Sequence, residues 1–134
     1  MKIDEVEGIG PAYAEKLGAA GVATTDDLLA AGATAAGRDK LAEATGLSGK
    51  LILEWVNHVD LMRIKGVGSE YADLLEAAGV DSPAELARRN AANLAITIQE
   101  VIAARPGIVR RAPSEDTISG WIAEAGKLGR AISH

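Results

Sequence analysis

The sequence predicts an all-α fold made of two similar helical units. Alanine, the strongest helix former, occurs 26 times in 134 residues, and β-branched runs typical of strands are few. A glycine-containing phrase recurs after 58 residues, and a tryptophan-containing segment recurs after 66 residues. Helix start and stop signals follow one another at short intervals, so we expect short helices and no β-strands.

The repeated segments define the expected units. VEGIGPAYAEKLGAAGV at residues 6–22 returns as IKGVGSEYADLLEAAGV at residues 64–80. Further along, three residues of the first copy have matches 66 residues later: Ser48 with Ser114, Ile52 with Ile118, and Trp55 with Trp121. The distance in sequence between matched residues increases from 58 to 66, which indicates an insertion in the second unit. We assign the insertion to IAARPGIVRR at residues 102–111. The sequence therefore predicts two units on one plan, at residues 1–60 and 61–134.

Each copy of the first phrase contains a Gly-apolar-Gly turn that predicts a hairpin between two helices. Both glycines of each pair allow backbone angles that a Cβ disfavours, and the apolar residue between them is expected to point inward. After each turn, Ala14 and Ala72 are small enough for the two helices to touch, so we expect both to be buried.

Glycines and capping residues predict where the next helices end and begin. Gly21 and Gly79 are expected to end the preceding helices in the left-handed conformation. Ser82-Pro83-Ala84-Glu85 has the pattern of a full capping box at a helix start, and Thr24 with Asp27 is its weaker copy.

The longest helix is expected from Ser48 to Ile64, with Gly66 following it. Apolar residues recur there at helical spacing on one face: Leu51, Ile52, Trp55, Val56, Val59 and Met62. Trp55 and Trp121 are therefore assigned to core packing rather than to base stacking, and His58 is expected to be partly exposed.

At the two hairpins the chain resembles the helix-hairpin-helix family. The family pattern is an apolar helix end, Gly-apolar-Gly, two or three variable residues, Ala, and an aliphatic residue. The wider pattern, including residues 27–61, also resembles an uncharacterised bacterial family built on two such units. The resemblance implies binding of DNA or RNA backbone, because the amide N–H groups of a hairpin and of the following helix start donate hydrogen bonds to a phosphate without reading bases.

The resemblance and the local charge together give a set of candidate nucleic-acid-binding residues. They are Gly8 and Gly10 in the first hairpin, Lys65, Gly66, Gly68 and Ser69 in the second, and Arg105, Arg110 and Arg111 in the insertion. The chain departs from the family pattern because no cation follows the second glycine of either hairpin. Pro11 lacks an N–H donor, and Glu70 places a negative charge where phosphate is expected.

Charge leaves a second interpretation open. Residues 1–60 carry five Lys and Arg against ten Asp and Glu, whereas residues 61–134 carry nine of each. Backbone binding requires a local basic patch, and five arginines supply candidates: Arg88, Arg89, Arg105, Arg110 and Arg111. If these arginines are only a solvated surface and the hairpins are structural, the chain is a protein-interaction or scaffolding module.

The sequence contains few of the residues that enzyme catalysis requires. There is no cysteine, and the two histidines, His58 and His134, form no pair with ligand or base spacing. Neither a phosphate loop nor a nucleophile elbow is present. We therefore expect a non-enzymatic module with no cofactor, no metal and no small-molecule substrate. No signal peptide or membrane-spanning run is evident, so a cytoplasmic location without membrane partners is expected.

Overall fold

The computed structural model describes all 134 residues and contains eight α-helices, one short 3-10 helix and no β-strand. The prediction of an all-α fold is confirmed. Contacts divide the chain into two compact units, one of Met1–Asp60 with Ala131–His134, called unit 1 below, and one of Leu61–Arg130, called unit 2. The last four residues therefore belong with unit 1, although the repeat pattern of the sequence predicts them in the second unit.

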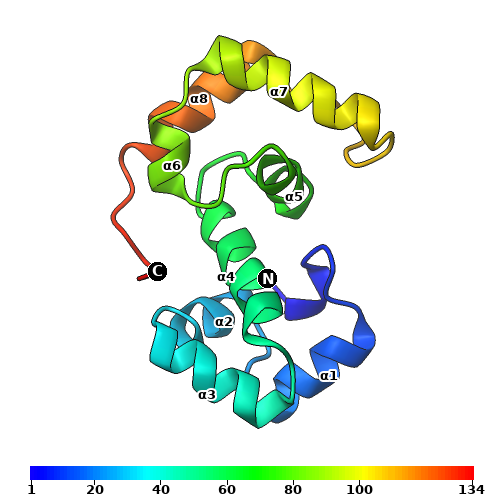
Figure 1. The fold of residues 1–134 in the computed structure, drawn as a ribbon, viewed down its shortest axis with the longest axis vertical. Coiled ribbons are helices and arrows are strands. Elements are labelled where there is room, and N and C mark those ends of the chain that lie inside the picture. The colour runs from blue at the N-terminus through cyan, green and yellow to red at the C-terminus, as the bar shows by residue number, and fades with distance from the viewer. The chain divides into compact units, whose positions relative to one another are not determined.

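Unit 1 contains the 3-10 helix and the first four α-helices (Figure 1), which are η1 (Ile3–Glu5), α1 (Pro11–Ala19), α2 (Thr25–Ala31), α3 (Ala35–Thr45) and α4 (Gly49–Leu61). Helix α1 packs against η1 and α3, and α2 packs against α3. The core is aliphatic apart from one tryptophan, and its fully buried members include Leu17, Leu28, Ile52 and Val56.

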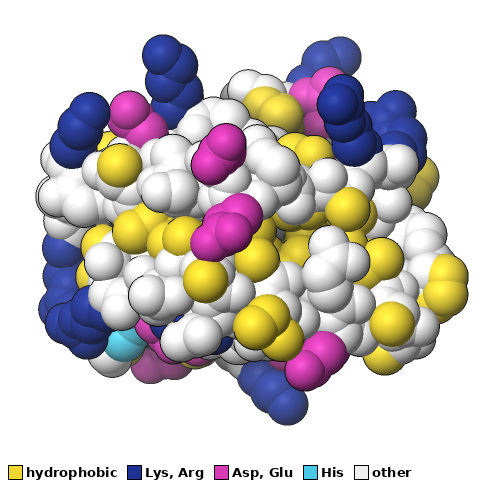
Figure 2. Space-filling model, turned by 90° about the horizontal axis from the view of Figure 1, so that it is seen from above, with side chains coloured by type: hydrophobic (Ala, Val, Ile, Leu, Met, Phe, Trp, Pro, Cys, Tyr) yellow, Lys and Arg dark blue, Asp and Glu magenta, His cyan; other side chains and the backbone are white.

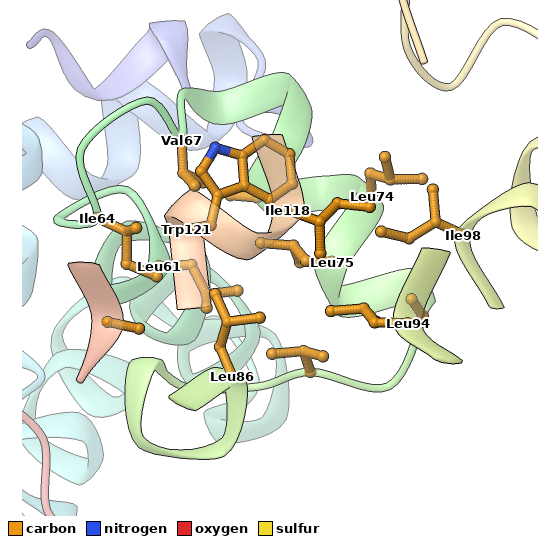
Figure 3. Packing of buried hydrophobic residues seen from close by; sticks show 14 of the residues in the cluster. Leu61, Ile64, Val67, Leu74, Leu75, Leu86, Leu94, Ile98, Ile118 and Trp121 are labelled. Carbon is orange, nitrogen blue, oxygen red and sulfur yellow. The ribbon is translucent and has the colours of Figure 1, made fainter. Parts of the chain in front are cut away.

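Unit 2 contains the remaining helices, α5 (Ser69–Ala77), α6 (Pro83–Ala87), α7 (Ala91–Ala104) and α8 (Glu115–Ala125). Helix α8 lies against α6 and α7, and α5 lies against α7. Figure 3 shows the aliphatic core between these helices, with the indole of Trp121 close to Val67 at one end of the cluster.

The predicted helix ends at Gly21 and Gly79 are confirmed. Both glycines have left-handed φ angles, +88° and +91°. The next residue folds back in each case, so that the Val22 N–H donates to the Leu17 carbonyl and the Val80 N–H donates to the Leu75 carbonyl, both at 2.9 Å. These bonds satisfy carbonyls that a helix end otherwise leaves unpaired.

The two capping signals occur in the reverse of the predicted order of strength. Thr24 and Asp27 form the complete box, because the Thr24 hydroxyl accepts from the Asp27 N–H and the Asp27 carboxylate accepts from the Thr24 N–H. Ser82 accepts from the Glu85 N–H, but the Glu85 carboxylate lies at the amide of Asp81, one residue before the cap. The box expected at Ser82 is therefore incomplete.

Three burial and boundary predictions for α4 and the hairpin helices need correction. Helix α4 ends at Leu61, because the Ile64 N–H turns back to the Leu61 carbonyl at 3.1 Å and starts the hairpin turn. His58 is only 3% exposed, although partial exposure was expected. Ala72 is fully buried as predicted, whereas Ala14 is only partly buried, so the first helix crossing is less enclosed than the second.

Candidate functional site

Within each hairpin, the two glycines have different conformations. Gly8 and Gly66 have φ angles of +86° and +90°, a region that residues with a side chain rarely occupy. Gly10 and Gly68, in contrast, have ordinary extended angles with φ of −84° and −89°, and a Cβ on either would meet nothing within 4 Å. The conformational requirement predicted for both glycines applies only to the first of each pair.

The turns bury the central apolar residue, as expected. The Ile9 N–H donates to the Val6 carbonyl, and the Val67 N–H donates to the Ile64 carbonyl, both at 3.0 Å. Ile9 and Val67 are 2% and 4% exposed. The hairpins are therefore fixed to the cores of their own units by one side chain each.

A tryptophan and a tyrosine pack beside each hairpin. The Tyr13 and Trp55 rings have centroids 5.1 Å apart, and the Tyr71 and Trp121 rings have centroids 4.9 Å apart. A Cβ added to Gly66 would lie 3.2 Å from Trp121 Nε1. Both tryptophans are buried, which agrees with their assignment to core packing and leaves no ring face for a nucleic-acid base.

The helices that follow the hairpins begin differently from the other six. Side chains cap the starts of α2, α3, α4, α6, α7 and α8, and the capping residues are Thr24, Thr34, Ser48, Ser82, Asn90 and Ser114. Helices α1 and α5 have Gly10 and Gly68 at this position, with no side-chain cap hydrogen bond. These two helices therefore start without a capping oxygen from the side chain of the N-cap residue.

Acidic residues surround the first hairpin. An open hollow of about 410 Å³ at this turn is lined by Asp4, Glu5, Val6, Glu7, Gly8, Ile9 and Gly10. Three of these residues carry carboxylates, and Pro11 at the first position of α1 has no N–H to donate. The first candidate site, at Gly8 and Gly10, thus combines an uncapped helix start with a negative surface.

The second hairpin differs in charge at the matching positions. Lys65 precedes Gly66, where the first copy has Glu7 before Gly8, and Ser69 replaces Pro11. Both Lys65 and Gly68 are exposed. The second hairpin therefore has a cation at its entrance and an N–H donor at the first position of α5.

The loop after α7 is attached to the first turns of α5. The backbone N–H of Arg110 donates to the Glu70 carboxylate, and Arg110 Nε donates to Glu70 Oε2 at 3.1 Å. The Tyr71 hydroxyl donates to the Arg111 carbonyl at 3.0 Å, and Arg105 lies 3.8 Å from Asp73. Three successive contacts therefore bring Arg110 and Arg111 next to the second hairpin.

The contact with Arg110 lowers the pKa of the Glu70 carboxyl. The Arg110 backbone amide is the largest cause that lowers the pKa of this carboxyl below its ordinary value, and the Arg110 side chain acts in the same direction against desolvation. Glu70 therefore stays ionised and paired. Because the Arg110 side chain is 93% exposed, the pair contributes little to stability, as is usual for surface ion pairs.

Three of the five arginines of the predicted basic patch form ion pairs. Arg105 and Arg110 are paired as described, and Arg89 lies 4.0 Å from Glu85. Arg88 is the C-cap residue of α6. Arg111 is exposed and lines an open hollow of about 360 Å³ with Tyr71, Ala112, Pro113, Ser114 and Thr117. Figure 2 shows Lys and Arg side chains interspersed with Asp and Glu on the face it displays, rather than one continuous basic surface.

No group of three or more His, Asp or Glu side chains is placed to hold a metal ion. None of the helices has the length and apolar character needed to cross a membrane.

The fold defines an all-α protein with two glycine-led hairpins, each followed by an uncapped helix. The chain belongs to the family described as domain of unknown function DUF4332, whose pattern matches residues 7–128. Neither a curated protein nor a solved structure is significantly similar to this chain.

Proposed function

We propose that this protein is a non-enzymatic module that binds nucleic-acid backbone phosphate through its second hairpin. The observation that carries the proposal is the start of α5, where an uncapped helix N-terminus lies beside Lys65 and the loop of Arg110 and Arg111. Amides at a helix start and the helix dipole favour an anion, and phosphate oxygens accept hydrogen bonds from such amides.

The resemblance to the helix-hairpin-helix family supports the same proposal. In that family, tandem Gly-apolar-Gly turns contact the phosphate backbone of DNA or RNA. The two hairpins of this chain share the positive φ of the first glycine and the buried residue between the glycines. We therefore interpret unit 1 and unit 2 as two units of this kind, with unit 2 as the binding unit.

Charge selects the second hairpin over the first. Phosphate brought to Gly8 and Gly10 meets the carboxylates of Asp4, Glu5 and Glu7. After Gly68, the first acid in the sequence is Glu70, and Arg110 already offsets its charge. Because Arg105 and Arg110 are paired with acids of α5, the cations that we assign to phosphate contact are Lys65 and Arg111. Ser69, the first residue of α5, follows Lys65 in the sequence.

The contacts in this proposal involve backbone amides and point charges, so they carry no information about base identity. Binding is therefore expected to be independent of sequence and to weaken with added salt, because each neutralised phosphate releases close to one counterion. With two cations in contact, the logarithm of affinity should fall with the logarithm of salt with a slope of about −2.

Fluorescence anisotropy with a labelled short duplex and a labelled single strand, each at several salt concentrations, tests the proposal. The variant Lys65→Glu with Arg111→Glu should lose most of the affinity and most of the salt slope. A matched control changes two exposed lysines of unit 1, Lys16→Glu with Lys50→Glu, which alters the net charge equally. Equal loss in both variants would show that only net charge matters.

Protein interaction or scaffolding is the second candidate function. It is favoured by the internal pairing of Arg105 and Arg110 with acids of α5, which reduces the charge available to a polyanion. Under this alternative the hairpins only connect helices. No binding of duplex or single strand by the parent protein at low salt would discard the nucleic-acid proposal in its favour.

A further inference from the structure

The carboxylate of Glu70 is held by two donors that both belong to Arg110. The backbone N–H of Arg110 donates to Glu70 Oε1, and Arg110 Nε donates to Glu70 Oε2 at 3.1 Å. Each carboxylate oxygen therefore has its own donor, one from the main chain and one from a cation. Charge-assisted hydrogen bonds of this kind are the ones by which proteins bind both carboxylate and phosphate groups.

The backbone of Arg110 is held in place by contacts that do not involve Glu70. Val109, the preceding residue, is 8% exposed and lies in the unit 2 core. On the other side, the Tyr71 hydroxyl donates to the Arg111 carbonyl at 3.0 Å. Because the residues on both sides of Arg110 are anchored, its N–H keeps its position whether or not Glu70 is paired with it.

The guanidinium of Arg110 has more donors than Glu70 uses. An arginine side chain carries several N–H groups in one plane, and Nε is the one that bonds to the carboxylate. The Arg110 side chain is 93% exposed, whereas that of Glu70 is 28% exposed. An anion from solvent can therefore contact the open part of the guanidinium first and then take the place of the Glu70 carboxylate.

The acid and the arginine loop occur together in unit 2 and not in unit 1. The residue that matches Glu70 in the first copy of the repeat, 58 positions earlier, is Ala12. Helices α3 and α4 are joined by residues 46–48, whereas α7 and α8 are joined by residues 105–114, which include Arg110. Unit 1 forms its hairpin and core without this pair, so the hairpin fold does not require it.

We propose that the N–H and guanidinium of Arg110 form a phosphate-binding site and that Glu70 is its built-in competitor. The planar fork of arginine fits phosphate as well as carboxylate, so the two groups compete for one position. Nucleic-acid backbone as the source of the phosphate rests on the proposed function, to which this site adds a third contact besides Lys65 and Arg111. The intact pair therefore weakens backbone binding, and loss of the Glu70 carboxylate strengthens it.

Titration of inorganic phosphate at constant ionic strength, followed by the Arg110 amide in NMR spectra of labelled protein, tests the site without nucleic acid. Glu70→Ala should lower the apparent dissociation constant about fivefold or more, because the site is then vacant for a larger fraction of the time. Asp73→Ala is the matched control. It removes the same charge from α5 but unpairs Arg105 instead, so the Arg110 amide should respond to phosphate as it does in the parent.

Two further measurements separate the site from a general effect on the loop. Arg110→Ala in the Glu70→Ala background removes the guanidinium and should return the affinity for phosphate to about the parent value. In Glu70→Ala alone, the Val109 methyl groups should keep their nuclear Overhauser contacts with the core, since the core holds the loop. Loss of these contacts, an Arg110 amide that does not respond to phosphate in Glu70→Ala, or an equal gain with Asp73→Ala would overturn the proposal.

A labelled short duplex distinguishes backbone phosphate from free phosphate as the ligand. In Glu70→Ala, the logarithm of affinity should fall with the logarithm of salt with a slope of about −3, against about −2 in the parent, because a third cation then contacts the backbone. An unchanged slope beside tighter binding of inorganic phosphate would overturn the backbone as the source. A parent protein that binds no duplex would discard the proposed function, and the phosphate titration would still decide whether Arg110 forms an anion site.

Discussion

The two hairpins have one backbone geometry and two different electrostatic environments. Gly8 and Gly66 have φ angles within a few degrees of each other. A tyrosine and a tryptophan pack at each, and both following helices lack a side-chain cap. The charges differ, with acids around the first turn and Lys65 at the second, where a loop of arginines also contacts α5.

This difference separates what the fold requires from what a function would add. Features present at both hairpins, such as the positive φ and the ring pair, are explained by the need to turn the chain and cover the core. Features present only at the second, such as Lys65 and the contacts to Arg110 and Arg111, have no such explanation from the turn itself. The proposal of a ligand at the second hairpin rests on these features.

The largest expected difference in stability concerns the small residue at each helix crossing. Ala72 is fully buried and Ala14 partly buried. Ala72→Leu should overpack its crossing and lower the free energy of unfolding by about 1–3 kcal/mol, whereas Ala14→Leu should cost less than about 1 kcal/mol because its side chain can extend toward solvent. Denaturant titration measures both. Equal midpoints would mean that the second crossing is no tighter than the first.

The first glycine of each hairpin gives the next contrast. Gly66→Ala should lower the unfolding free energy by about 1–2 kcal/mol from the positive φ alone, with an added cost because the new Cβ lies 3.2 Å from Trp121. Gly8→Ala carries the same backbone cost, but its contact with Trp55 at 3.7 Å is an ordinary one. Gly68→Ala is the control: its extended backbone suits Ala and its Cβ meets nothing, so it should cost less than Gly66→Ala, with only the small loss expected when Ala replaces Gly at an N-cap. Equal thermal midpoints for Gly66→Ala and Gly68→Ala would contradict the account.

Removing the tyrosine hydroxyls should have a smaller effect, confined to unit 2. Tyr71→Phe deletes the hydrogen bond to the Arg111 carbonyl and should cost about 0.5–1.5 kcal/mol, toward the lower end at this exposed site. Tyr13→Phe keeps the ring contact with Trp55 and should be close to neutral. Thermal unfolding compares the two, and a larger loss for Tyr13→Phe would show that the hydroxyl contact in unit 2 is unimportant.

Acid should break the contact between Glu70 and Arg110 with little loss of stability. The lowered pKa of Glu70 means that its contact with Arg110 is complete above the ordinary glutamate pKa and is lost as pH falls through the folded-state pKa, which lies below that ordinary value. The Arg110 amide shift in NMR follows this transition, and Glu70→Gln should abolish it. A midpoint at or above the ordinary value would contradict the assigned contact.

Local signals in the sequence predicted much of the fold. Gly21 and Gly79 end helices as expected, and the tryptophans lie in the core, because these features depend on residues a few positions apart. The sequence predicted that this helix ends at Ile64, whereas α4 ends at Leu61. The difference arises because the apolar spacing continues into the turn, where Ile64 is buried without being helical.

Contacts between distant residues could not be predicted in the same way. Glu70 and Arg110 are 40 positions apart, and no spacing rule relates them. From sequence alone, Glu70 was expected to repel phosphate and Arg110 to attract it, whereas the structure pairs them. The hydrogen bond from Arg38 to the Ser133 carbonyl has no local signal either, since the last four residues are too few to show periodicity.

The most direct test of the central claim is to map the amides that a nucleic acid perturbs. Addition of a short duplex at low salt to isotopically labelled protein should shift the amides of residues 65–72 and 110–111, and leave those of residues 7–14 unchanged. The shifts should disappear in Lys65→Glu with Arg111→Glu and persist in Lys16→Glu with Lys50→Glu. Shifts centred on the first hairpin, or none at either hairpin, would contradict binding at the second.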